Sequence, residues 1–345
     1  MRDSVRQPSG SDTMDSSRPH SARIWNYLVG GKDFYPVDAE AAERVLAVFP
    51  GMRDITFQSR AFIGRVVRHL AGEAGIRQFL DIGTGLPTQD NTHEVAQRVA
   101  PECRIVYVDN DPLVLAHARA LLASSPEGAC DYIDADVRDP DRILQRAADT
   151  LDFSRPVGLM LMGILGLVPD YDEARDVVRR LLDALPPGSY LGLNDGSATD
   201  PAYVEAIRRH NESSGATPYT PRTPEEITGF FDGLEMLTPG VVTCSQWRLE
   251  IAPFGTPEEV AVYGGWPART DPRSVSPRSA SPRPTPRVKA SPTTWGRSRP
   301  SRSCISTSQR CPPCPRWSGR ATAGASRTRC TSRARPWSGR TGCRC

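Results

Sequence analysis

A short glycine-containing segment, residues 81–87 (DIGTGLP), has the composition of a ligand-binding turn. It follows an apolar run at residues 78–82 that is typical of a buried strand, and a helical pattern begins near Thr92. Glycines at a strand-to-helix turn let the backbone approach a ligand closely, at the sheet edge where open α/β folds bind nucleotides. We therefore expect Gly83 and Gly85 to lie against such a ligand, with an ordinary tight turn as the alternative.

Acidic residues end the next two predicted strands. Asp109 lies 24 residues after Gly85, where a carboxylate can accept hydrogen bonds from both hydroxyl groups of a ribose. Helix capping is the alternative for Asp109, but Asp111 is better placed for that role. Asp134 and Asp136 end the third strand and add further polar groups above the sheet, with a solvated loop carboxylate as the alternative for these two residues and for nearby Asp139.

The charge of the glycine segment distinguishes between two ligands that contain adenosine. A dinucleotide site of the NAD type has a third glycine at the position of Thr88, and Pro87 precedes it here. Asp81 at the start of the segment would also repel a pyrophosphate. S-adenosylmethionine has no phosphate and carries a sulfonium and an ammonium, so the segment favours S-adenosylmethionine over the alternative of an NAD-dependent oxidoreductase.

Three further sets of residues could have a function, but each also has a simpler explanation. His93 is a candidate general base, but it also fits the first turn of a helix. Asn194 and Asp195 follow the fifth predicted strand, where a turn with Gly196 explains them nearly as well. The pair Cys311-Pro-Pro-Cys314 has metal-ligand spacing but lacks a second pair in a foldable module, so we predict no metal site.

The hydrophobic pattern alternates between strand and helix, which is typical of an α/β fold. The predicted strands are residues 78–82, 104–108, 131–135, 157–162 and 189–193. Helices at 38–49 and 54–70 precede them and predict an N-terminal helical cap. The other predicted helices begin near Thr92 and Pro112 or span 174–185, 202–211 and 224–231. Apolar segments at 241–249 and 260–263 are expected to pair as an antiparallel hairpin.

Charge divides the chain into two parts. The whole sequence has a formal net charge of +3, although residues 271–345 alone hold 16 Arg, one Lys and one Asp. The remainder is therefore acidic and a poor candidate for specific nucleic-acid binding. We expect disorder in residues 1–20, a folded domain in 21–268, and a disordered basic Arg/Pro/Ser-rich tail in 269–345, whose composition also suits a frame-shifted translation. With no apolar membrane or secretory segment, we expect a cytoplasmic protein.

The strings that carry these features resemble the bacterial S-adenosyl methyltransferase family, formerly a domain of unknown function, of high-GC Gram-positive bacteria. The resemblance covers about residues 20–265. It rests on residues 22–33 (ARIWNYLVGGKD), 78–88 (QFLDIGTGLPT), 106–112 (VYVDNDP) and 134–136 (DAD). It implies a Rossmann-like class I methyltransferase fold, with a seven-stranded sheet whose last strand is antiparallel, and S-adenosylmethionine as cofactor.

The resemblance also implies roles for individual residues. Asp81, Gly83 and Gly85 would line the methionine end of the cofactor, and Asp109 would hold the ribose. Asp136 would contact the adenine amine, and Asn110 would border the adenine. The string at 22–33 looks like a lid over the cofactor or substrate. Arg23, Asn26 and Tyr27 in that string either take part in binding or simply pack one face of a short helix.

One position departs from the family pattern. Relatives usually have a His after the fourth strand, whereas this chain has Gly166 in the string LGLVPD of residues 165–170. The expected activity is methyl transfer to an unidentified, small-molecule acceptor. A non-catalytic protein that binds or senses S-adenosylmethionine is the alternative that the missing His supports.

Overall fold

The computed structural model describes residues 15–121, 123–248 and 257–270. All of them belong to the first of two units, Met1–Ser281. Residues 271–345 of the expected tail and most of the N-terminal segment 1–20 therefore lie outside the described residues, whereas Arg269, expected in the tail, hydrogen-bonds to the folded domain at Gly188 and Ser189. None of the helices in the described ranges is long and apolar enough to cross a membrane.

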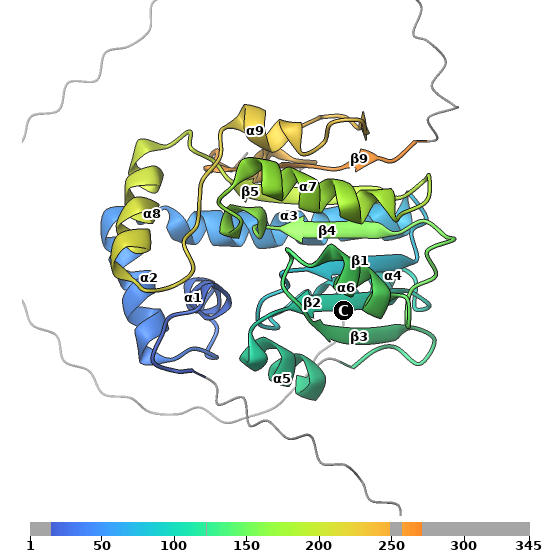
Figure 1. The fold of residues 1–345 in the computed structure, drawn as a ribbon, viewed down its shortest axis with the longest axis horizontal. Helices are drawn as coiled ribbons and strands as arrows, with labels where there is room; N and C mark the ends of the chain where they lie inside the picture. Colours follow the sequence, from blue (N-terminus) through green and yellow to red (C-terminus); the bar gives the residue numbers. More distant parts are fainter. Residues whose placement is uncertain (1–14, 122, 249–256, 271–345) are drawn as a thin grey trace, which may run out of the picture. The chain divides into compact units, whose positions relative to one another are not determined.

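A mainly parallel sheet forms the centre of the fold (Figure 1). Its strands are β1 Gln78–Ile82, β2 Arg104–Asp109, β3 Ala129–Asp134, β4 Gly158–Met162, β5 Tyr190–Gly196, β6 Glu235–Met236, β7 Val242–Thr243, β8 Val262–Gly265 and β9 Pro267–Ala268. The main path runs β3-β2-β1-β4-β5-β8-β7, in which the first five strands are parallel and β8 is antiparallel to β5.

Helices cover both faces of this sheet because neighbouring residues of each strand point to opposite sides. On one face, Phe79 and Ile105 pack with α3 Met52–Gly72 and α4 Thr92–Val99. On the other face, Leu80 and Val106 pack with α6 Pro140–Ala147 and α7 Tyr171–Asp183. Figure 1 shows α6 and α7 in front of the sheet and α3 and α4 behind it. Parallel strands that are buried on both faces explain the continuous apolar runs in the sequence.

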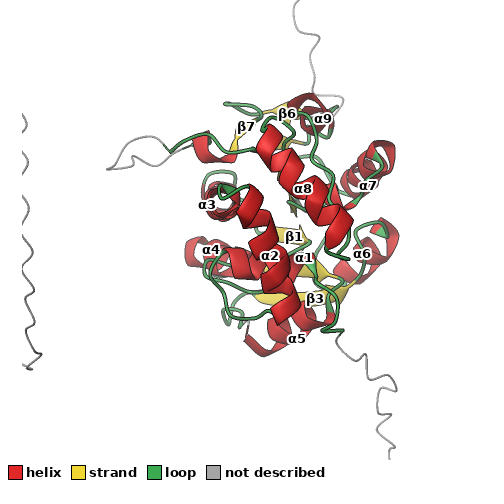
Figure 2. Ribbon diagram, turned by 90° about the vertical axis from the view of Figure 1, so that its left-hand side faces the viewer, coloured by secondary structure: helices red, strands yellow, loops and turns green. Residues whose placement is uncertain are grey.

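Three helices gather beyond the carboxyl ends of the parallel strands. They are α1 Ser21–Leu28, α2 Pro36–Val48 and α8 Pro201–Ser213, and Figure 2 shows them in front of the sheet. Helix α5 Pro112–Leu121 follows β2, and the short α9 Pro224–Gly229 follows the loop after α8. Of the two helices that the sequence predicted as a cap, α2 lies over the sheet edge that carries the glycine segment, whereas α3 packs mainly on one face of the sheet.

The class I methyltransferase-like fold is confirmed, with several differences in detail. The sheet has nine strands, because the two-residue strands β6 and β9 add to the predicted seven. The predicted closing hairpin forms between β7 and β8. Asn194, Asp195 and Gly196 belong to β5 and pair with β8, so the turn suggested for them is wrong. The sequence reading missed α6, whose apolar pattern is short.

Candidate functional site

A cavity of about 510 Å³ opens at the carboxyl ends of β1, β2, β4 and β5. Its walls include Gly83, Asp109, Asp136 and Asn194 from the sheet edge, and the cap closes over them through Trp25 of α1. Its volume lies in the range of pockets that enclose a small ligand. The structure thus brings the predicted glycine segment, the strand-terminal acidic residues and the predicted lid together around one space.

The turn after β1 needs its two glycines. Gly83 and Gly85 have φ angles of 76° and 64°, in the left-handed region that other residues rarely adopt. A Cβ on Gly83 would lie 2.6 Å from Ile164 Cδ1, whereas a Cβ on Gly85 would meet no atom within 4 Å. The backbone at Gly85 is therefore open, and both glycines line the cavity. The ordinary-turn explanation accounts for the φ angles but not for this exposure to the cavity.

Asp109 stands at the end of β2 and fixes the glycine segment. Its Oδ2 accepts a hydrogen bond from Gly85 N at 2.9 Å, and its Oδ1 accepts one from Asp111 N at 2.9 Å. Burial raises the pKa of Asp109 above its usual value, and these two backbone donors oppose that rise. Each carboxylate oxygen keeps a second acceptor position, so Asp109 can still accept hydrogen bonds from a ligand.

Asp81 is the second buried carboxylate of the cavity. Its Oδ2 accepts a hydrogen bond from Thr92 Oγ1 at 2.6 Å, at the start of α4. Burial raises the pKa of Asp81 to about 6, while Thr92 and the nearby positive charge of Arg60 act in the opposite direction. A cationic group bound beside Asp81 would relieve part of this unfavourable burial.

Asn110 and Asp136 lie at the more open rim of the cavity. Asn110 Nδ2 donates to Asp136 Oδ2 at 3.4 Å, so residues that follow different strands meet there. Asp136 Oδ1 also accepts from the backbone N of Arg138 at 2.9 Å. The rim therefore presents amide and carboxylate groups that suit the polar edge of a heterocyclic base.

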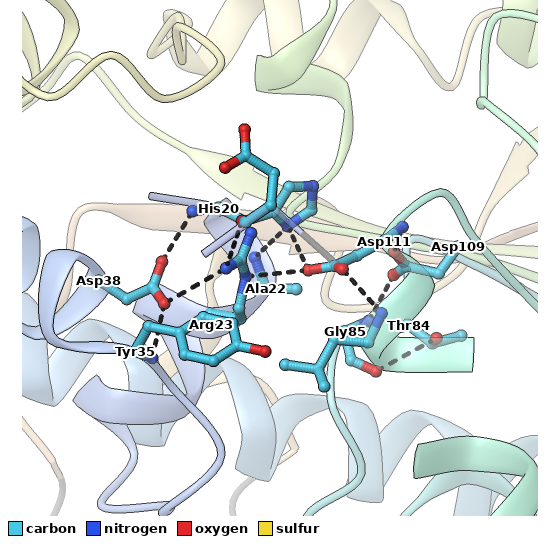
Figure 3. Close-up of polar contacts among 11 residues, drawn as sticks. His20, Ala22, Arg23, Tyr35, Asp38, Thr84, Gly85, Asp109 and Asp111 are labelled. Atoms are coloured by element: carbon cyan, nitrogen blue, oxygen red, sulfur yellow. Dashed lines mark hydrogen bonds and ion pairs between the residues drawn. The ribbon is translucent and has the colours of Figure 1, made fainter. Parts of the chain in front are cut away.

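Arg23 holds α1 in place from inside the protein. Its Nε donates to Asp111 Oδ2 at 3.2 Å, and its Nη1 lies 3.7 Å from Asp38 Oδ2. Figure 3 shows Arg23 between these two carboxylates, with Asp109 and Gly85 on the far side of Asp111. His20 Nδ1 lies 3.1 Å from the same Asp111 oxygen. This cluster of His20, Arg23, Asp38 and Asp111, here called the α1 latch, connects the lid to the sheet edge and to α2.

The other lid and base candidates have different positions. Asn26 lines the cavity, and its Oδ1 accepts from Asp33 N at 3.0 Å. Tyr27 does not line the cavity, because its hydroxyl group donates to Glu43 on α2. His93 is buried behind the glycine segment, with its Nδ1 2.9 Å from Tyr107 Oη. Burial lowers the pKa of His93, and His93 is not among the lining residues.

A polar cluster at the end of β5 completes the cavity. Asn194 and Asp195 are fully buried and line the cavity together with Tyr219. Asp195 Oδ1 accepts hydrogen bonds from the Tyr219 hydroxyl group and from Gly196 N, and its Oδ2 lies 3.5 Å from Arg222 Nη1. Burial raises the pKa of Asp195 to about 6, which Tyr219 and Arg222 counteract.

Tyr219 occupies the space that a side chain at position 166 would need. A Cβ on Gly166 would lie 2.3 Å from Tyr219 Cζ, and Thr220 N donates to Gly166 O at 2.8 Å. Asn211 fixes the backbone of Tyr219 through two hydrogen bonds of 2.8 and 2.9 Å. The sequence did not predict Tyr219 as a site residue, because Tyr219 lies in the loop between α8 and α9 and not at the end of a predicted strand.

The residues around the cavity fit S-adenosylmethionine. Asp81, Asp109 and Asp195 place three buried carboxyl groups on the wall, which favours a ligand that carries positive charge and hydroxyl groups. The open backbone at Gly85 leaves room for close approach. In the described parts of the chain, no three His, Cys, Asp or Glu residues are grouped as a metal site would require.

Comparisons with known proteins agree with this geometry. A family model described as S-adenosyl methyltransferase matches residues 7–270. A DUF574 family protein from Streptomyces avermitilis is 45% identical, with a TM-score of 0.71, over 75% of this chain and 100% of its own. A candidate methyltransferase from Thermobifida fusca is 42% identical, with a TM-score of 0.69, over 78% and 100%. Carboxy-S-adenosyl-L-methionine synthase from Citrifermentans bemidjiense is 28% identical over 231 residues, 64% of this chain and 87% of that protein.

Proposed function

The chain belongs to the S-adenosyl methyltransferase family, and from that premise we propose that it methylates a small molecule enclosed in the cavity between the sheet edge and the cap. The observation that carries this proposal is the cavity of about 510 Å³, which joins the glycine segment after β1 to the polar cluster at the end of β5. A bulky macromolecular acceptor would have to displace α1, which the α1 latch holds with buried ion pairs.

We assign the cofactor-binding residues by their positions along the sheet edge. Asp81, Gly83 and Gly85 would hold the methionine end, where a buried carboxylate suits an ammonium group. Asp109 would accept hydrogen bonds from the ribose, and Asn110 and Asp136 would border the adenine. When bound, S-adenosylmethionine supplies a methyl group that is already activated by its positively charged sulfur.

The residues of this chain then have to orient the acceptor and exclude water. Orientation is the main requirement of such a displacement, because the leaving group is good without further assistance. Trp25, Ile55 and Ile207 form apolar walls of the cavity, and α1 covers it. This arrangement supports catalysis without a fixed triad, and it makes the absence of a His at position 166 compatible with an enzyme.

Calorimetric titration of the full chain tests the cofactor assignment. We expect S-adenosylmethionine to bind and NAD not to bind. Asp109→Ala should weaken binding by about 2 to 4 kcal/mol, because a charged acceptor of ribose hydrogen bonds is lost. A matched change at an exposed carboxylate, Asp183→Ala, should leave the affinity unchanged. Binding of NAD alone would overturn the assignment.

Product analysis separates enzymatic from sensing behaviour. We expect mass spectrometry to detect S-adenosylhomocysteine when the protein is incubated with S-adenosylmethionine and a cell extract. Tight binding without turnover across several extracts would support the sensor. A carboxylated S-adenosylmethionine would instead assign the chain the activity for which the Citrifermentans bemidjiense relative is named.

A further inference from the structure

The strand order separates the cavity into two ends. The sheet edge runs β2, β1, β4, β5, so Asp109 and the glycine segment lie on one side of β4, and Asn194 and Asp195 lie on the other. If the ribose lies at β2 and the methionine end at β1, as proposed above, the acceptor must approach the methyl group from the β4 and β5 side. The end of the cavity at β5 is therefore the part left for the acceptor.

An unused hydrogen-bond acceptor lies at this end. Asn194 is fully buried, and its Nδ2 donates to Ser59 Oγ at 2.9 Å. Its Oδ1 has no hydrogen-bond partner among the described residues. That oxygen lies 4.0 Å from the position of a Cβ on Gly163, which also lines the cavity. A buried carbonyl oxygen without a donor is unfavourable, and a donor on a ligand would satisfy it.

The charge of this end determines which ligands it favours. Asp195 is fully buried beside Asn194, and Arg222 lies 3.5 Å from its Oδ2. The arginines among the described lining residues lie toward the cofactor end, since Arg60 acts on Asp81 and Arg138 is 3.7 Å from Asp136. Arg222 balances the charge of Asp195, so the β5 end offers hydrogen-bond acceptors, and no Lys or Arg among its described lining residues remains to pair with a carboxylate. Trp25, Ile55 and Ile207 provide the apolar remainder of the cavity.

We propose that the β5 end is the acceptor subsite, and that it takes a small molecule with an apolar body whose O–H or N–H group donates to Asn194 Oδ1. This inference rests on the proposed function, because it assumes that the cofactor fills the other end. It adds the substrate class: an uncharged alcohol or an amine, rather than a carboxylic acid. Asn194 is a binding residue here, and Ser59 is the positioning residue that orients its amide group.

A series of matched probes tests the subsite in the full chain. Benzyl alcohol and benzylamine carry a donor, benzyl methyl ether carries only an acceptor, and benzoate carries a negative charge. Affinities are measured by ligand-observed NMR with saturating S-adenosylhomocysteine in the cofactor end. We expect the two donors to bind about tenfold more tightly than the ether, the equivalent of one hydrogen bond, and benzoate to bind most weakly.

Two variants locate the effect. Asn194→Leu should abolish the preference for donors and leave the affinity for S-adenosylhomocysteine unchanged. Asn110→Ala, at the opposite end, should weaken S-adenosylhomocysteine binding and leave the donor preference intact. If Asn194→Leu does not fold, the wild-type series still decides, because it needs no variant.

The possible failures can be told apart. Equal affinity for benzyl alcohol and its methyl ether, or tighter binding of benzoate, would overturn the inference while S-adenosylhomocysteine binding upholds the cofactor assignment. Failure of S-adenosylhomocysteine to bind would overturn the proposed function and this inference with it. A donor preference that persists in Asn194→Leu would show that another group recognises the acceptor.

Discussion

Asp81, which we propose binds the ammonium end of the cofactor, illustrates how such a residue can be unfavourable for folding. Its carboxyl group is buried, and its pKa of about 6 lies well above the ordinary value of 3.8. A raised pKa in the folded state means that protonation stabilises the fold, so stability from this group is lost as the pH rises through about 6. We propose that the protein retains this cost because the charged form is the one that binds a cationic ligand.

We predict that Asp81→Asn stabilises the ligand-free protein at alkaline pH. The gain should grow from about 1 kcal/mol at pH 4.5 to about 3 kcal/mol at pH 8, following a shift of roughly two pKa units. Urea unfolding at the two pH values measures it, and Asp183→Asn on the surface serves as the control. The same variant should bind S-adenosylmethionine more weakly. Lower stability of Asp81→Asn at pH 8 would mean that Thr92 and Arg60 outweigh the cost of burial.

The contact between Gly166 and Tyr219 leads to a second prediction at this scale. Gly166→Ala would place a Cβ 2.3 Å from Tyr219 Cζ, so Tyr219 has to move and its hydroxyl group leaves Asp195. We expect a loss of about 1 to 3 kcal/mol, typical of overpacking. Thermal unfolding measures it.

Two further variants control this test. Gly64→Ala on α3 should be neutral or stabilising, because its nearest neighbour, Arg68 Nη1, is 3.5 Å away. The double variant Gly166→Ala/Tyr219→Ala should lose less than the sum of the two single variants. Strict additivity would show that the two positions do not compete for space.

At the scale of elements, the α1 latch allows a test of what holds α1 over the cavity. Arg23 is buried, and removing it would leave Asp111 and Asp38 without their cation. We predict that Arg23→Met destabilises the protein by about 3 kcal/mol, because two buried carboxylates lose their counter-charge. Amide hydrogen exchange in residues 21–28 should accelerate more than in α7. Arg179→Met, which breaks only exposed pairs on α7, should change neither quantity. Unchanged protection of α1 would show that apolar packing alone holds the lid.

The elements that the sequence predicted are those with a strong apolar period. In α3, which corresponds to the helix predicted at 54–70, Phe62, Val66, Val67 and Leu70 are all fully buried at helical spacing. Helix α6 was missed because its eight residues bury only Pro140, Ile143 and Ala147, too few to establish a period. The parallel strands are also continuous apolar runs, so their ends could be predicted from the sequence. Asp81, Asp109 and Asp136 were found at or just after these ends.

The β5 end of the site was much harder to predict. The sequence indicated Asn194 and Asp195 as polar residues at the end of the fifth strand, but a polar pair before a glycine is also the pattern of a turn. The pairing of β5 with β4 and β8 shows that they are strand residues. Tyr219 and Arg222 reach Asp195 from a loop more than 20 residues away in sequence, and no local pattern encodes such a contact.

At the scale of the whole molecule, the limit of the folded domain is testable. Arg269 N donates to Ser189 O, and Gly188 N donates to Arg269 O, each at 2.7 Å. A cut after Arg269 keeps both bonds. We predict that this truncation leaves the melting temperature and the S-adenosylmethionine affinity unchanged, because every strand of the main path precedes it. A cut after Val260, which removes β8 and β9, is the matched control and should prevent folding. Unfolding of the longer version would show that residues beyond 269 complete the domain.

The composition of the cavity wall also determines when the cavity is completed during synthesis of the chain. The wall combines Trp25, near the beginning of the chain, with Tyr219 and Val262, near the end of the domain. The ribosome synthesises Trp25 first and Val262 last. A nascent chain shorter than about 262 residues therefore has the glycine segment but lacks part of the cavity wall. The wall of the cavity is therefore completed late in the synthesis of each molecule, well after the glycine segment.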